Sequence, residues 1–237
     1  MTQTLGIAVD SAVPGTGPIL SEAWFATPRC VEQLLAQVGR VDVAAERPQR
    51  IAAGPPQSTN GAIRIVNVFG PMLKFPGFWT WFLGGTSTFE LRKETAAAAA
   101  DNRVAGIVLR IHSPGGEVAG TDDLALAVRE ASKREPVIGF IEDMGASAAY
   151  YVAGRAGRIV STESALVGAL GVLTVIADRS VEFTRAGVTV HVVGTSELKG
   201  LGVAGKPVTE ADIEELTRVV QAAGFRSPSF RKLGRVG

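Results

Sequence analysis

Cysteine and histidine are nearly absent from this sequence, and their scarcity excludes several kinds of chemistry. Cys30 is the only cysteine, so the chain has no intrachain disulfide and no four-cysteine zinc site. A single cysteine fits a reducing compartment, and we expect the protein in the cytoplasm. His112 and His191 are the only histidines, so the sequence offers few candidates for the histidine of a Ser-His-Asp triad.

The sequence also lacks an excess of charge of one sign and lacks long hydrophobic runs. The 24 basic and 23 acidic residues leave a net charge of +1, which gives no electrostatic reason to expect nucleic acid or an anionic membrane surface as a partner. No apolar run reaches the roughly 18 residues of a membrane-spanning helix, so none is predicted. The first residues, "MTQTLGIAVDSAVPGTG", lack the basic start and apolar core of a signal peptide.

The rest of the composition is typical of a globular protein with one large domain. Hydrophobic residues make up 46% of the 237, which is enough for a sizeable buried core. Residues 1–61 are predicted to form an N-terminal arm, a short helix at 27–39 and a linker at 40–61. Residues 62–237 alternate between strand and helix patterns and are predicted to form the main domain.

This alternation predicts an α/β fold with repeated strand–helix units on a mostly parallel sheet and flanking helices. The predicted strands are 63–70, 104–112, 136–142, 157–162 and 188–194. The strand at 104–112 is strongly apolar and is predicted to be buried. The predicted helices are 86–101, 120–135, 147–156, 178–187 and 209–224. In such sheets, functional sites gather at the carboxyl ends of the strands. Two of these strand ends carry turns of functional interest.

The first turn is "SPGG", which follows the strand at 104–112 and includes Gly115 and Gly116. Two glycines after a proline let the backbone turn sharply and point amide N–H groups outward. With a helix following, the turn suits an oxyanion hole or a phosphate cradle, and a plain strand-to-helix turn fits the spacing equally well. No Gly-Lys-Ser/Thr follows, which counts against nucleotide binding. We expect neither a cofactor nor a metal.

The second turn is "EDMGASAAYY", in which Ser147 begins a helix after the strand at 136–142. A serine on a tight turn at a strand end is the position of a nucleophile. It is equally the position of an ordinary helix cap. The sequence around Ser147 only half matches the Gly-x-Ser-x-Gly pattern, so both interpretations stay open at this point.

A nucleophilic serine needs a base to take its proton. His112 and His191 fall within or beside predicted strands, and we interpret both as structural. A lysine can replace histidine when burial favours its neutral form. The lysines that follow Ser147 in the chain are Lys199, Lys206 and Lys232. Lys199 comes just after the strand predicted at 188–194, at the expected edge of the site.

Four segments follow one another in the order "SPGG", "DMGASAAYYVAG", "ALVGALGVLTVIADRS" and "GVTVHVVGTSELKG". Together they resemble the signal peptide peptidase A family and its phage branch, the prohead or capsid-maturation proteases. The resemblance covers about residues 62–223. It implies a ClpP/crotonase-like fold and a Ser/Lys dyad that hydrolyses peptide bonds.

The resemblance also implies roles for single residues. Ser147 matches the nucleophile and Lys199 matches the general base. Gly115 and Gly116 match the oxyanion turn, and the backbone amide of Ala148 matches the second oxyanion donor. The family often has Gly-Gly after the serine where this chain has two alanines. Because only a backbone amide is needed there, we expect the site to be intact.

A serine endopeptidase of the phage prohead or scaffold-maturation type is the first functional hypothesis, acting in the cytoplasm of a bacterial or phage-infected cell. The expected partners are a polypeptide substrate, either a capsid scaffold or signal peptides, and further copies of the chain in a homo-oligomer. The alternatives are a signal-peptide-remnant peptidase of the signal peptide peptidase A type, a non-proteolytic crotonase-like acyl-CoA enzyme, and an inactive structural homologue.

Three further features bear on this hypothesis. The sequence shows no anchor like that of the membrane-bound members, and "SEAWFATPRCVEQLLAQV" is similar to the leader of phage-type members, which favours the phage branch. The family continues past the last predicted helix, whereas this sequence ends in "FRSPSFRKLGRVG", so truncation and a recoded tail are both open. The aromatic segment 75–82 is predicted at a substrate groove or a subunit contact, not in a membrane.

Overall fold

The computed structural model describes residues 24–26 and 62–225, so the helix predicted at 27–39 and the linker at 40–61 lie outside the described residues. The main sheet is parallel and has the strand order β2-β5-β7-β8, with β9 pairing beside the carboxyl end of β7. Its strands are β2 (Ala62–Phe69), β5 (Val104–Ser113), β7 (Val137–Ala146), β8 (Arg158–Ser161) and β9 (Leu166–Gly168). The predicted α/β class with a mostly parallel sheet is confirmed.

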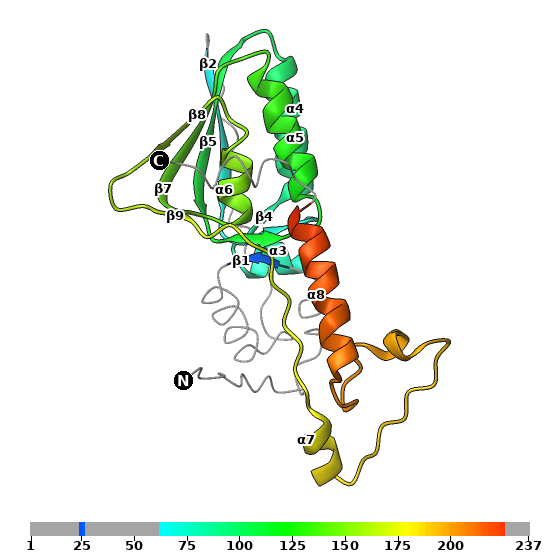
Figure 1. Cartoon of the computed structure of the whole chain (residues 1–237). Helices are drawn as coiled ribbons and strands as arrows, with labels where there is room; N and C mark the ends of the chain where they lie inside the picture. Colours follow the sequence, from blue (N-terminus) through cyan, green and yellow to red (C-terminus); the bar gives the residue numbers. More distant parts are fainter. Residues whose placement is uncertain (1–23, 27–61, 226–237) are drawn as a thin grey trace.

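Three helices cover one face of this sheet (Figure 1): α4 (Thr88–Ala100), α5 (Thr121–Ser132) and α6 (Ala148–Ala153). Ser87 caps α4 by accepting a hydrogen bond from the backbone N–H of Glu90, which satisfies one of the free amides at the helix start. In α5, Leu124 and Val128 repeat at a spacing of four and are fully buried.

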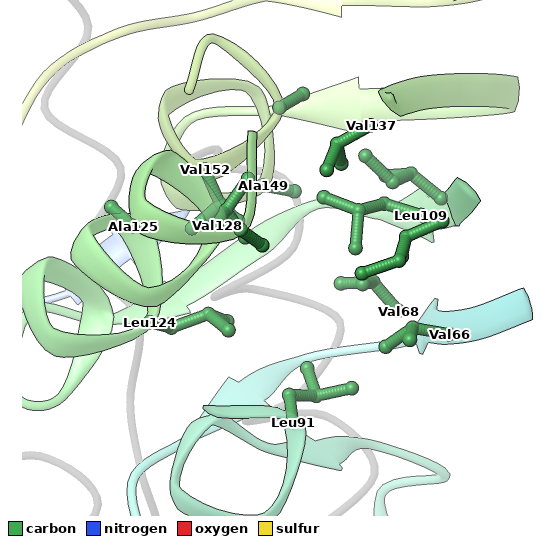
Figure 2. Close-up of a cluster of buried hydrophobic side chains, with 14 of the residues drawn as sticks. Val66, Val68, Leu91, Leu109, Leu124, Ala125, Val128, Val137, Ala149 and Val152 are labelled. Atoms are coloured by element: carbon green, nitrogen blue, oxygen red, sulfur yellow. The ribbon is translucent and has the colours of Figure 1, made fainter. Parts of the chain in front are cut away.

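The core lies between this face and the helices, as Figure 2 shows. Aliphatic side chains from the strands and from the helices interdigitate there. The strands contribute Val66, Val68, Leu109 and Val137, and the helices contribute Leu91, Leu124, Val128, Ala149 and Val152. Burial of one such valine or leucine stabilises the fold by about 1.5–3 kcal/mol. This packing therefore fixes the positions of the strand ends.

The opposite face of the main sheet is less covered. The strand at 104–112 was predicted to be a buried strand, but only alternate side chains of β5 are buried. Ile107, Leu109 and Ile111 are inside, whereas Arg110 and His112 point to the other face and are exposed. On β2, Ile63 and Ile65 are each about half exposed.

A second, small sheet lies at the carboxyl end of the main one (Figure 1). Its order is β1-β6-β3-β4, and its strands are β1 (Trp24–Ala26), β6 (Gly115–Glu117), β3 (Met72–Leu73) and β4 (Thr86–Ser87). It lies there because β3 follows β2 and β6 follows β5 after very short connections. The strand β1 is antiparallel to β6, whereas β3 is parallel to it. The short helix α3 (Phe78–Phe82) connects β3 to β4.

After β9 the chain leaves the sheet for α7 (Ser180–Arg185), the 3-10 turn η1 (Glu197–Gly200) and α8 (Glu210–Phe225) (Figure 1). The prediction of a strand at 188–194 is wrong, because these residues form no strand in the structure. An extended segment becomes a strand only when a neighbouring strand pairs with its backbone. Val193 in this segment is 97% exposed. Within the described residues, no helix is long and apolar enough to cross a membrane.

We predict that Gly116→Ala destabilises the protein, because β3 and β6 approach too closely for any side chain. A Cβ at Gly116 would lie 1.9 Å from the carbonyl oxygen of Met72. The backbone must therefore shift, at a cost of about 1–3 kcal/mol or more. Urea denaturation should show a lower midpoint for this variant. Gly77→Ala, with nothing within 4 Å of its Cβ, is the control and should leave the midpoint nearly unchanged.

Candidate active site

The carboxyl ends of β5 and β7 bring the two turns together. Ser113 of β5 and Gly145 of β7 are register partners, so the glycine turn and Ser147 leave adjacent strands at the same edge of the sheet. The helix α6, which begins directly after Ser147, packs against β6, which contains Gly115 and Gly116. The residues expected to form a nucleophile and an oxyanion turn therefore share one place in the fold.

Ser147 has a backbone conformation that L-residues rarely adopt, with φ 51° and ψ −116°. Such a conformation costs of the order of 1–3 kcal/mol and tends to occur at functional sites. The hydroxyl makes no capping hydrogen bond to α6. It donates instead to the carbonyl oxygen of Gly171 at 3.3 Å. The simple cap interpretation of this serine therefore has no support in the geometry.

The segment 168–171 lies over Ser147. The backbone N–H of Ser147 donates to the carbonyl oxygen of Gly168 at 2.7 Å, and the hydroxyl contacts Gly171 as described. Ser147 is completely buried as a result. Ala169, between these two contacts, also has a positive φ of 52°. Sequence reasoning did not identify these acceptors, although the glycines of "VGALGVL" were a visible signal for an unusual backbone.

The glycine turn is held by Ser113, a second residue that sequence reasoning did not assign. The Ser113 hydroxyl donates to the carbonyl oxygen of Gly70 at 2.6 Å and accepts a hydrogen bond from the N–H of Gly115 at 3.2 Å. Gly115 has φ 97°, a conformation that favours glycine. Because the amide of Gly115 is engaged inside the turn, Gly116 and Ala148 are the stronger candidates for oxyanion donors.

Lys199 is not brought to Ser147 within the chain. It lies in η1, and its side chain is exposed. Figure 1 shows this segment, in orange just before α8, well away from α6. The structure of one chain therefore separates the two residues of the expected dyad.

The other candidate bases named from the sequence include His112, His191 and Lys232. His112 Nδ1 lies 3.3 Å from a carboxylate oxygen of Asp143, and both side chains are exposed. His191 lies in the exposed segment 188–194. Lys232 lies outside the described residues.

Lys206 takes part in an ion pair at the start of α8. Its ammonium group lies 2.7 and 2.8 Å from the two carboxylate oxygens of Asp212, which is 2% exposed. Asp212 also accepts hydrogen bonds from the backbone N–H and the hydroxyl of Thr209. The Lys206 hydrogen bond, followed by that of the Thr209 amide, lowers the pKa of Asp212 to about 2. We interpret Lys206 as a structural residue.

An aromatic cluster on α3 lies next to the small sheet. The ring of Phe78 is 5.2 Å from that of Trp79 and 5.6 Å from that of Phe82, measured between centroids. Phe78 is 38% exposed and Phe75 is 60% exposed. The rings are thus only partly covered by their own chain. The expectation that they lie at a substrate groove or a subunit contact stays a prediction.

Comparison with known proteins relates this chain to peptidases. The model of peptidase family S49 matches residues 129–223. The chain is 32% identical over 120 residues to "Putative protease MJ0651" of Methanocaldococcus jannaschii, covering 51% of this chain and 39% of that protein. It is 28% identical over 178 residues to "Protease 4" of Salmonella typhi, covering 72% and 27%. It is 32% identical over 110 residues to "Capsid assembly protease C" of Escherichia phage lambda, covering 46% and 24%.

The matched region contains Ser147, Lys199 and α6. The resemblance to the signal peptide peptidase A and phage prohead protease group is therefore confirmed. The chain spans less than half of the length of each of these curated relatives. Among solved structures, a membrane-bound stomatin-specific protease in complex with a substrate peptide matches with a TM-score of 0.36 and 14% identity, covering 67% of this chain and 57% of that chain.

We predict that Ser147→Gly gives a more stable protein than Ser147→Ala. Both substitutions remove the hydroxyl, but only glycine adopts φ 51° without strain. Relief of about 1–3 kcal/mol of strain exceeds the 0.5–1 kcal/mol that glycine costs through chain entropy. Thermal unfolding of the two variants checks this, with Ser161→Gly against Ser161→Ala on an exposed strand as the control. A Ser147→Gly variant less stable than Ser147→Ala, by the roughly 0.5–1 kcal/mol that glycine costs, would show that the backbone there is not strained.

Proposed function

We propose that this chain is a serine endopeptidase in which Ser147 is the nucleophile and Lys199 the general base. The backbone amides of Gly116 and Ala148 hold the oxyanion, and Gly115 shapes the turn that presents Gly116. The observation that carries the proposal is Ser147 itself. It is a strained, fully buried serine at the carboxyl end of a parallel strand, beside a glycine turn, and its hydroxyl does not cap the helix that follows. The family match supports peptide-bond chemistry at this place.

The reaction follows from these roles. The hydroxyl oxygen of Ser147 attacks the carbonyl carbon of the scissile peptide bond, and neutral Lys199 accepts the hydroxyl proton. The resulting oxyanion receives hydrogen bonds from the two amides. The carbon–nitrogen bond then breaks, and Lys199 delivers its proton to the leaving amine. Water attacks the acyl-enzyme with Lys199 as the base, and the proton returns to Ser147 as the acid product leaves.

The position of Lys199 supports a homo-oligomer. A lysine acts as a base only in its neutral form, and burial favours that form. In the single chain Lys199 is exposed. Val188, Val192 and Val193, in the segment that precedes it, are 46%, 39% and 97% exposed. A second copy that pairs with 188–194 would cover these valines, bury Lys199 and bring it to the serine of that copy.

The substrate is an extended polypeptide, and a capsid or scaffold protein is the first candidate. The similarity to a protein named as a capsid assembly protease supports this candidate. The similarity to Protease 4 keeps a remnant signal peptide as the second candidate. The family model and the curated relatives reported above are peptidases, which favours peptide-bond hydrolysis over acyl-CoA chemistry.

We predict that a fluorophosphonate probe labels the wild-type protein and not Ser147→Ala. The probe forms a covalent bond with an activated serine hydroxyl, so removal of that hydroxyl abolishes labelling. The substitution removes one long hydrogen bond, from the hydroxyl to the carbonyl oxygen of Gly171 at 3.3 Å, at a cost of about 0.5–1.5 kcal/mol, so the variant should remain folded. Ser161→Ala, on the exposed strand β8, is the matched control and should label like the wild type. Labelling of Ser147→Ala at the wild-type rate would show that Ser147 is not the nucleophile.

We predict that Lys199→Ala and Lys199→Arg both lose peptidase activity, because guanidinium stays protonated and cannot serve as a base. Lys133→Ala is the control, since this exposed lysine pairs with Glu130 on the surface of α5.

Mixing the inactive variants tests the shared site. If the dyad forms between copies, Ser147→Ala mixed with Lys199→Ala restores activity, because one pair of chains then carries an intact serine and an intact lysine. An active Lys199→Ala protein would show that another residue is the general base. Activity that is lost in both variants but not restored by mixing would place the dyad within one chain.

A further inference from the structure

The strand β6 has no free edge in the described part of the chain. One edge pairs with β3, where Met72 is the register partner of Gly116. The other edge pairs with β1, where Trp24, Phe25 and Ala26 face Glu117, Gly116 and Gly115. The backbone of residues 24–26 therefore runs antiparallel along the glycine turn, next to the proposed oxyanion donor.

This edge is where an extended peptide would have to bind. Proteins that act on extended peptides commonly hold them by adding the peptide backbone to an open strand edge. The β3 edge of β6 cannot serve, because the backbone approach at Gly116 leaves no room even for a Cβ. The opposite edge is the one that lies along the glycine turn beside Ser147, and β1 fills it.

We propose that β1 is an intramolecular occupant of the substrate groove, so that the segment at residues 24–26 restrains the peptidase until a substrate strand displaces it. This inference rests on the proposed function. The pairing is short, with three residues on each side, so a substrate strand can exchange with it. Because β1 belongs to the same chain, it competes at a high effective concentration.

The test is the double variant Phe25→Pro/Ala26→Pro, assayed with fluorescently labelled casein as an extended substrate. Successive N–H groups of a strand point in opposite directions, so two consecutive prolines remove whichever one faces β6. Phe25→Ala/Ala26→Ser is the matched control, because it keeps both N–H groups. The proline variant should hydrolyse casein at least about fivefold faster than the control at limiting substrate concentration.

Labelling of Ser147 by the small fluorophosphonate probe separates this inference from the proposed function. Equal labelling of both variants, with faster casein hydrolysis by the proline variant, supports the restraint. Equal labelling, with equal or slower casein hydrolysis by the proline variant, overturns it and makes β1 a permanent part of the fold. Absence of labelling in the wild type would overturn the proposed function and this inference with it.

A second measurement does not depend on how the proline variant folds. In the Ser147→Ala protein, casein binds without being cleaved. The amides of residues 24–26 should then exchange hydrogen faster when casein is bound than in the free protein. Unchanged protection of these amides in the presence of saturating casein would overturn the restraint.

Discussion

The register between β5 and β7 is the constraint on which the rest of the site depends. The pairing is regular as far as Ile111 and Ile141, and the next register partners are Ser113 and Gly145. Two residues of β5 are thus matched by four of β7, which makes a bulge just before the site. The bulge carries the end of β7 past the glycine turn and places Ser147 beside it. This irregular pairing therefore determines how the glycine turn and Ser147 lie relative to each other.

The strain at Ser147 is held in place by what surrounds it. The helix α6 and the strand ends are packed into the core, with Ala148, Val152 and Ile141 at 0% exposure. A residue cannot leave an unfavourable backbone conformation when the elements on both sides are fixed in this way. The carbonyl oxygens of Gly168 and Gly171 complete the restraint from the other side. The core therefore positions the serine as well as stabilising the fold.

Sequence reasoning identified the strand ends because their signals are local. The apolar strand at 104–112, the glycine turn and the serine after 136–142 all fall where they were expected, and the parallel sheet follows from the strand–helix alternation. The prediction that β5 is a buried strand holds for one face only, since Arg110 and His112 are exposed on the other. Composition alone does not show which face a helix will cover.

The parts that sequence reasoning did not find depend on contacts between distant residues. The hydrogen bond from the Ser113 hydroxyl to Gly70 joins residues that are 43 positions apart, and no local pattern indicates it. The predicted strand at 188–194 is rich in the β-branched residues of a strand, yet no strand pairs with it among residues 24–26 and 62–225. Lys199 follows that segment, so the missing strand partner also explains why Lys199 lies far from Ser147.

Under the proposed function, the strand β1 and the extended segment 188–194 give the activity opposite dependences on protein concentration. Occupation of the β6 edge by β1 is intramolecular, so dilution does not weaken it. The proposed completion of the dyad by a second copy is intermolecular, so dilution weakens it. At low concentration, β1 would then stay on the β6 edge, and Ser147 would have no Lys199 from a second copy as its base. A chain concentrated together with its polypeptide substrate would gain the base under the proposed function, and the substrate strand would compete for the β6 edge. Under the proposed function, self-association would control activity through strand pairing alone.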